Sequence, residues 1–194
     1  MRGSRWQCRG RGSAGGGGQG GARPGRAGGG GRQVTAAPGG VAGLDRIAQV
    51  KLPVTDLARS VTWYRRLLDL RLWTEFAEDG VLRGAGLIDP PGRFSIAVRD
   101  RVACASQPRL EGFDVVAFRP ASRSVLEDLA VRWDRLGIAH SGICETGAGP
   151  RLDVPDPDGT VVRFYYHTGP TGQFTGLDMR GGQVVGTYHT PRLH

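Results

Sequence analysis

Apolar and polar residues alternate in short runs through the middle of the chain, and the first run predicts a strand over residues 46–54. A helix should follow with Asp56 as its N-cap, and its apolar stripe consists of Leu57, Val61, Tyr64, Leu67 and Leu68. Three further strands are predicted over 70–76, 81–88 and 93–99, separated by Gly80 and by the Asp-Pro-Pro-Gly segment at 89–92. The first half of this region therefore has the order βαβββ.

The same order repeats about 66 residues later. A strand is predicted over 113–119, and a helix should begin with a Ser124/Glu127 capping box and end at Gly137. Its apolar stripe consists of Val125, Leu129, Trp133 and Leu136. Strands over 138–144, 151–154 and 160–166 complete the unit, with an Asp-Pro-Asp-Gly turn at 156–159.

A βαβββ unit cannot cover both faces of its own sheet, so two units are expected to lie side by side. The predicted fold class is α+β, with two βαβββ modules forming a curved eight-stranded mixed sheet, a cleft within it and the helices outside. The domain should span 44–168, with a first module at 44–101 and a second at 112–168. Residues 169–194 are expected to form an irregular C-terminal tail with one candidate strand at 183–188.

Residues 1–43 are predicted to be a disordered tail, because their first 40 positions hold 16 of the 33 glycines and almost no apolar side chains. An RNA-binding tail would carry more aromatics than Trp6, and a targeting peptide would need serine and an amphipathic pattern. The favoured interpretation is translated upstream sequence, with Val34 as a candidate first residue.

Charge and cysteine content narrow the classes of partner. The net charge is +8, but residues 1–40 contain seven arginines and no acid, so the rest of the chain is close to neutral. Neither nucleic acid nor a membrane is therefore expected as a partner. Three cysteines without a CxxC pair predict no disulfide framework and favour a cytoplasmic location. No apolar run is long enough to span a membrane.

Five stretches in the right order, about 125 residues in all, resemble the vicinal-oxygen-chelate family, which includes glyoxalases, bleomycin-resistance proteins and extradiol dioxygenases. Residues 50–64 resemble its first strand and helix, and Leu68-Asp-Leu70 stands where many members have Leu-Gly-Leu. Residues 114–118 resemble the strand that opens the second unit. The remaining two stretches are Gly137-Ile-Ala-His-Ser-Gly-Ile143 and the closing hairpin at 156–164.

The resemblance implies a divalent metal held by a His early in each unit's first strand and a Glu late in each unit's last strand. Three of these positions match Gln49, Val115 and Arg163, and the fourth lies near the end of strand 93–99, which holds no acid before Asp100. Valine cannot bind a metal, and arginine brings a positive charge where the cation would sit. We therefore expect no metal and no other cofactor. A replacement site at His140 and His167 is the alternative to check.

Strand alternation places the expected ligand-binding residues on the cleft face. They are Gln49, Lys51, Val115, Ala117, His140, Arg163 and Tyr165. Lys51 and Arg163 would bind an anionic group of a small organic molecule, or else pair with acids such as Asp114 or Glu145. His140 faces the cleft or is a hydrogen-bonded structural residue. Trp63, Trp73 and Trp133 are expected in the core.

Two functional classes follow from the resemblance. The first is a metal-free protein that binds or sequesters a small anionic or aromatic molecule, as the family's resistance members do, with a homodimer as an allowed assembly. The second is a lyase, isomerase or dioxygenase with an unusual or absent metal site. The missing ligands favour the first class and leave open whether the chain is an enzyme.

Overall fold

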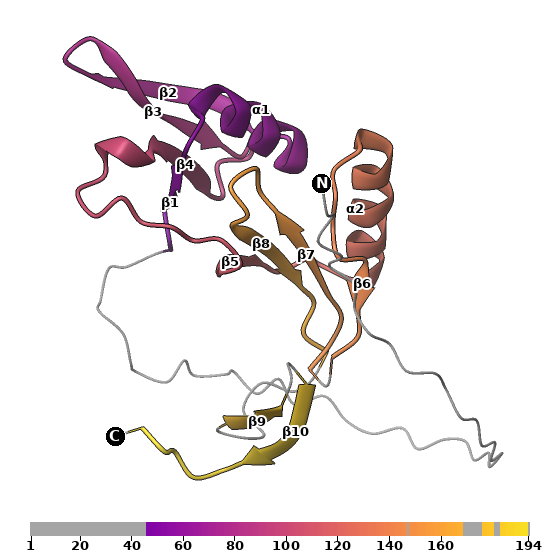
Figure 1. Cartoon of the computed structure of the whole chain (residues 1–194). Coiled ribbons are helices and arrows are strands. Elements are labelled where there is room, and N and C mark those ends of the chain that lie inside the picture. Colours follow the sequence, from indigo (N-terminus) through magenta and orange to yellow (C-terminus); the bar gives the residue numbers. More distant parts are fainter. Residues whose placement is uncertain (1–45, 147, 169–175, 181–182, 194) are drawn as a thin grey trace, which may run out of the picture. The chain divides into compact units, whose positions relative to one another are not determined.

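Strand pairing in the computed structural model reveals the duplication directly (Figure 1). The structure describes residues 46–146, 148–168, 176–180 and 183–193. The first module consists of β1 (Gln49–Val54), α1 (Leu57–Leu68), β2 (Arg71–Glu78), β3 (Val81–Ile88), β4 (Ser95–Asp100) and the short 3-10 turn η1 (Arg101–Ala103). Its sheet has the order β1-β4-β3-β2, with β1 and β4 parallel.

The second module repeats this arrangement. It consists of β5 (Asp114–Phe118), α2 (Arg123–Leu136), β6 (Ile143–Cys144), β7 (Arg151–Pro155) and β8 (Val161–Tyr165). The sheet order is β5-β8-β7-β6, again with the first two strands parallel. The predicted pair of βαβββ modules is confirmed, and the eight strands are hydrogen-bonded as two sheets of four.

One hydrophobic core is shared by the two modules. Along β1 the side chains alternate, so that Leu52 and Val54 are buried while Gln49 and Lys51 are exposed. Leu52 and Val54 belong to the same cluster as Trp133, which is fully buried in α2. Burial of apolar surface in this cluster is the main favourable contribution to the stability of the fold.

Local signals set the ends of the helices. The Asp56 carboxylate accepts a hydrogen bond from the backbone N–H of Arg59 at 2.9 Å, as expected for an N-cap. Gly137 ends α2 in the left-handed region at φ 65°, also as expected. The N-cap of α2 is Ser122, however, and not Ser124. The predicted capping box is wrong because the Ser122 hydroxyl accepts from the backbone N–H of Val125 at 3.3 Å, which places Ser124 inside the helix, and Glu127 pairs with Arg123 at 2.9 Å.

The strand predicted over 138–144 shortens to β6. Gly142 has φ 71°, which interrupts an extended strand. The Ser141 hydroxyl also accepts a hydrogen bond from the backbone N–H of Asp153 at 3.0 Å, while the backbone N–H of Ser141 donates to the Asp153 carbonyl at 2.9 Å. Only Ile143 and Cys144 then pair with β7.

The Asp-Pro-Asp-Gly turn of the second module docks on the start of α1. One carboxylate oxygen of Asp156 accepts from the backbone N–H groups of Asp158 and Thr160, at 2.9 and 2.8 Å. The other oxygen accepts from the Tyr64 hydroxyl at 2.9 Å, in a buried contact. Asp158 in turn accepts from the backbone N–H of Thr55 at 2.9 Å. The turn that closes the second sheet is therefore fixed by the first module.

The C-terminal ends of the two helices are also tied together. The indole N–H of Trp133 donates to the carbonyl of Leu67 at 3.0 Å. The Arg66 guanidinium donates to the carbonyl of Leu136 at 2.7 Å, and the Arg132 guanidinium donates to the carbonyl of Arg66 at 3.3 Å. Each helix thus provides donors for carbonyl groups that the other helix leaves without an internal partner.

The expected strand at 183–188 is present as β10 (Gln183–Tyr188). It pairs antiparallel with β9 (Gly176–Arg180), which the sequence analysis did not predict. The ring of Tyr188 lies over Gly176, so a Cβ at that position would fit only if the ring moved. The disordered tail predicted for residues 1–43 lies outside the described residues.

The hydroxyl of Tyr64 provides a test of the contact between modules. Tyr64→Phe removes one donor to the buried Asp156 carboxylate, so we expect the free energy of unfolding to fall by about 1–3 kcal/mol. Urea denaturation followed by circular dichroism would measure it. Tyr166→Phe is the matched control and should change the free energy by less than about 0.5 kcal/mol. Equal effects of the two variants would contradict the assignment.

Asp156 should also give the stability a pH dependence. Burial raises the pKa of this carboxyl above its ordinary value, and its hydrogen bonds offset that only in part. The folded state therefore holds the proton more tightly, so stability falls as the pH rises through the titration range of this group. As the pH is raised from about 3 to about 6, the free energy of unfolding of Asp156→Asn should therefore increase relative to that of the unmodified protein. Asp128 is exposed, and Asp128→Asn is the control. Its free energy of unfolding, measured by urea denaturation, should differ from that of the unmodified protein by a constant amount over the same pH range.

Candidate functional site

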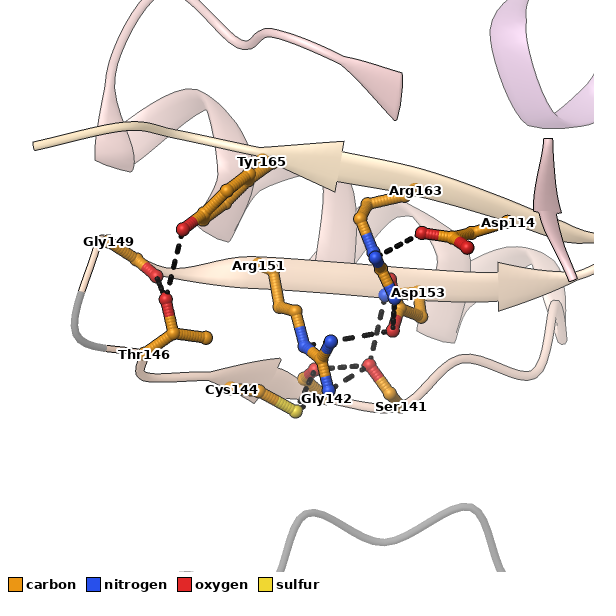
Figure 2. Close-up of polar contacts among 10 residues, drawn as sticks. All are labelled: Asp114, Ser141, Gly142, Cys144, Thr146, Gly149, Arg151, Asp153, Arg163 and Tyr165. Atoms are coloured by element: carbon orange, nitrogen blue, oxygen red, sulfur yellow. Dashed lines mark hydrogen bonds and ion pairs between the residues drawn. The ribbon is translucent and has the colours of Figure 1, made fainter. Parts of the chain in front are cut away.

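The second sheet carries a cluster of four charged side chains on one face, which consists of Arg163 and three charged neighbours (Figure 2). β8 lies between β5 and β7, so Arg163 is paired with Ala117 on one side and with Asp153 on the other. Paired residues of neighbouring strands point to the same face of a sheet. Arg163, Ala117 and Asp153 are thereby brought together.

Two carboxylates hold the Arg163 guanidinium. Asp153 accepts from Nε at 2.7 Å and from Nη2 at 3.0 Å, in a bidentate arrangement, and Asp114 accepts from Nη1. The hydrogen bonds to Asp153 raise the pKa of Arg163, so it remains a cation. Arg151 lies 3.7 Å from Asp153 and supplies a second positive charge. The two arginines and two aspartates therefore balance in formal charge.

A bulge in β5 brings Asp114 into this cluster. The pairing of β5 with β8 shifts between Asp114 and Val116, and Asp114 then lies opposite Val161. Strict alternation had placed Val115 and Ala117 on one face, but the bulge breaks that pattern. Val115 packs against the hydrophobic core, whereas Ala117 is exposed beside Arg163.

On the first sheet, the predicted site residues Gln49 and Lys51 are both exposed. Lys51 is paired with Ala97 of β4. Within the part of the chain that the structure describes, Lys51 forms no ion pair and its ammonium group accordingly keeps its donors for solvent or a ligand. The alternative that Lys51 pairs with an acid is therefore not observed there.

Arg99 and Phe76 lie on the same face of the first sheet. The Arg99 guanidinium carbon is 5.4 Å from the centre of the Phe76 ring, and Arg99 also pairs with Glu78. Phe76 covers Gly84 of β3, where any Cβ would collide with the ring. This part of the face is thus an aromatic surface with a neutralised cation.

Strand register identifies the fourth position at which the family resemblance implies a metal ligand. Arg163 pairs with Ala117 in the second module, and the corresponding pair in the first module is Ala97 with Lys51. The four positions are therefore Gln49, Ala97, Val115 and Arg163. Alanine and valine have no donor atom, and arginine is a cation, so these residues do not fit a divalent metal.

Asp100 is the acid nearest to Ala97 in the sequence, but its side chain lies on the opposite face of β4. It is paired with buried Val54 and forms an ion pair with Arg83 at 2.8 Å. The described residues also contain no group of three or more His, Cys, Asp and Glu side chains arranged to hold a metal ion.

His140 lies against α2 and uses both ring nitrogens within the protein. Nε2 is 3.1 Å from the carboxylate of Asp134, and Nδ1 accepts from the backbone N–H of Gly142 at 3.1 Å. This placement matches the structural alternative considered for His140. His167 instead contacts the ring of Tyr165, with 4.0 Å between ring centres. The two histidines have separate partners and form no common site.

Tyr165 is the remaining predicted site residue, and it lies on the Arg163 strand (Figure 2). Its hydroxyl is 3.1 Å from the hydroxyl of Thr146, and its strand partner is Arg151. Sequence reasoning missed Arg151 and Asp153. The alternation of charges along 151–153 opposite Arg163 was the signal that could have indicated them.

Trp73 is also placed differently from the prediction. It is 62% exposed on β2, one of the two edge strands of the first sheet, and is not a core residue. An edge strand has a neighbour on one side only, so its apolar residues are covered less than those of β3 and β4. Trp133 lies in the core as predicted, and Trp63 is partly buried and packs against the core cluster.

The Arg163–Asp153 pair should be energetically coupled. In a double-mutant cycle with Arg163→Met and Asp153→Asn, we expect a coupling free energy of about 1–3 kcal/mol, because the pair is bidentate and partly buried. The exposed pair Arg123–Glu127 is the control and should give about 0.5 kcal/mol or less. Thermal and urea denaturation of the unmodified protein, the four single variants and the two double variants would measure both values. Equal coupling in the two cycles would contradict a special role for Arg163.

Comparison with solved structures identifies the fold. A glyoxylase/bleomycin resistance protein/dioxygenase domain from Frankia sp. EAN1pec is 24% identical, with a TM-score of 0.53 over 67% of this chain and 96% of that one. TnmS3, an antibiotic binding protein from Streptomyces sp. CB03234, is 16% identical, with a TM-score of 0.54 over 65% and 98% of the two chains.

A fosfomycin resistance protein, FosX from Listeria monocytogenes, is 11% identical, with a TM-score of 0.51 over 67% of this chain and 97% of that one. No protein-family model and no curated protein sequence matches the chain. None of the helices described is long and apolar enough to cross a membrane. The duplicated βαβββ modules and these structural neighbours together show that the chain has the fold of the vicinal-oxygen-chelate proteins.

Proposed function

We propose that this chain is a metal-independent binding protein for a small organic molecule that combines an aromatic or apolar body with a negatively charged group. The observation that carries the proposal is the Arg163 guanidinium, bound by Asp153 and Asp114 at a position where the resemblance implies a metal ligand. A fixed cation at this position repels a divalent metal ion.

The neutralisation of Arg163 changes which residue is offered to the ligand. Asp153 and Asp114 balance the charge of the Arg163 guanidinium, so an incoming anion would have to compete with two carboxylates. Lys51 has no such competitor among the described residues and is exposed on the corresponding face of β1. We therefore assign the anionic group of the ligand to Lys51 and give Arg163 the role of organising the second sheet.

The ring systems on these faces support an aromatic ligand. Tyr165 is partly exposed beside Arg151, and Phe76 lies against Gly84 on the first sheet. Aromatic side chains provide much of the contact area in small-molecule sites. The structural neighbours are consistent with binding of this kind, since TnmS3 is described as an antibiotic binding protein.

A pair of dyes tests the proposal. 1-Anilinonaphthalene-8-sulfonate carries an aromatic body and one negative charge, and N-phenyl-1-naphthylamine is its uncharged counterpart. We expect saturable fluorescence enhancement with the sulfonate dye, and Lys51→Met should weaken that binding about 3–10-fold while leaving the neutral dye unchanged. Prior dialysis against EDTA should alter neither result, because no metal takes part.

The matched control is Arg135→Met, which makes the same change in net charge on an exposed position of α2. It should leave the affinity for both dyes unchanged. The proposal fails if EDTA abolishes binding, or if the Arg135 variant weakens the sulfonate dye as much as the Lys51 variant does. It also fails if neither dye binds saturably.

A further inference from the structure

A concave region lies between the C-terminal ends of α1 and α2, and none of the residues of the proposed site line it. It is a pocket of about 350 Å³, and its lining residues are Thr62, Arg65, Arg66, Asp69, Leu70, Arg132 and Leu136. Three arginines and one aspartate give it a formal charge of +2. Two leucines and a threonine hydroxyl complete the wall.

Two of the arginines are held in place by the fold. Arg66 donates to the carbonyl of Leu136 at 2.7 Å, and Arg132 donates to the carbonyl of Arg66 at 3.3 Å. Each of these two contacts uses one terminal nitrogen, and a guanidinium has five N–H donors in a planar fork. Both groups are therefore oriented by the helix ends and retain donors for a further partner.

Arg65 differs from these two. It lines the pocket from the last turn of α1, is exposed, and its side chain makes no hydrogen bond or ion pair within the described part of the chain. Among the described lining residues the one acid is Asp69, which lies 3.9 Å from Arg132 and is 82% exposed. One carboxylate at this distance does not neutralise three guanidinium groups.

We propose that this pocket binds a small molecule through a phosphate or carboxylate group, independently of the sheet face that carries Lys51. Converging guanidinium groups recognise planar or tetrahedral oxyanions through paired N–H donors. A pocket of about 350 Å³ lies at the lower end of the usual range for small-molecule sites, so the ligand is compact.

The position of the pocket gives the binding a structural consequence. Residues of both modules line it, Arg66 and Leu70 from the first and Arg132 and Leu136 from the second. An anion held by arginines of both helices stabilises the folded chain, because it binds the folded state and not the unfolded one.

The test uses pyrophosphate and citrate as probes of the two oxyanion types, each compared with sodium chloride at equal ionic strength. Isothermal titration calorimetry and the shift in thermal midpoint would be measured on the full chain. We expect saturable binding of at least one probe together with a rise in the thermal midpoint that chloride does not produce. A response to pyrophosphate alone would assign a phosphate ligand, and a response to citrate alone a carboxylate ligand.

Arg65→Gln is the informative variant, because Arg65 has no structural partner whose loss would unfold the protein. It should weaken binding about 3–10-fold and leave the thermal midpoint without probe unchanged. Arg135→Gln removes the same charge from the last turn of α2, where Arg135 does not line the pocket, and should leave the affinity unchanged. Absence of saturable binding by both probes, or equal weakening by the two variants, would overturn the proposal.

Discussion

The carboxylate of Asp156 is the point on which the arrangement of the two modules depends. It is 5% exposed, and its two oxygens accept two backbone N–H groups of its own turn and the hydroxyl of Tyr64 from α1. A buried carboxylate is tolerated only when its hydrogen bonds offset the loss of hydration. The turn can therefore form at full stability only when the first module is in place. Since this turn joins β7 to β8, it also sets the register that brings Asp153 opposite Arg163.

That register places an arginine, and not a metal ion, between the carboxylates of the cluster around Arg163. A divalent ion needs lone pairs from several side chains that surround it, whereas here the cation is part of the chain and two aspartates serve as its ligands. The guanidinium is always charged and is fixed by a bidentate contact, so it holds β5, β8 and β7 in position without an external ion. Because the cluster is balanced in formal charge, the proposed function assigns the anionic group of the ligand to Lys51 and not to Arg163.

Duplication of the module has a second consequence on the helical side. The indole of Trp133 meets the carbonyl of Leu67 at a separation of 66 residues, the same separation as between Arg132 and the carbonyl of Arg66. Helix C-termini present carbonyl groups without internal partners, and arginine or tryptophan donors from the other module satisfy them. The pocket of three arginines arises at this junction because both copies place basic side chains at the ends of their helices.

The sequence by itself determined the elements and their order. Hydrophobic periodicity gave both helices and the alternation along β1, and short-range signals located the Asp56 and Gly137 caps, because these features depend on residues close together in the chain. It also supplied three of the four positions at which metal ligands were expected.

The features that only the tertiary structure decided depend on contacts between distant strands. The bulge in β5 that turns Asp114 toward Arg163 follows from pairing with β8. Ala97 was identified only by its pairing with Lys51, and Trp73 is exposed because β2 became an edge strand. Pairing partners and strand order are set by packing across the whole domain, and no local pattern of residues encodes them.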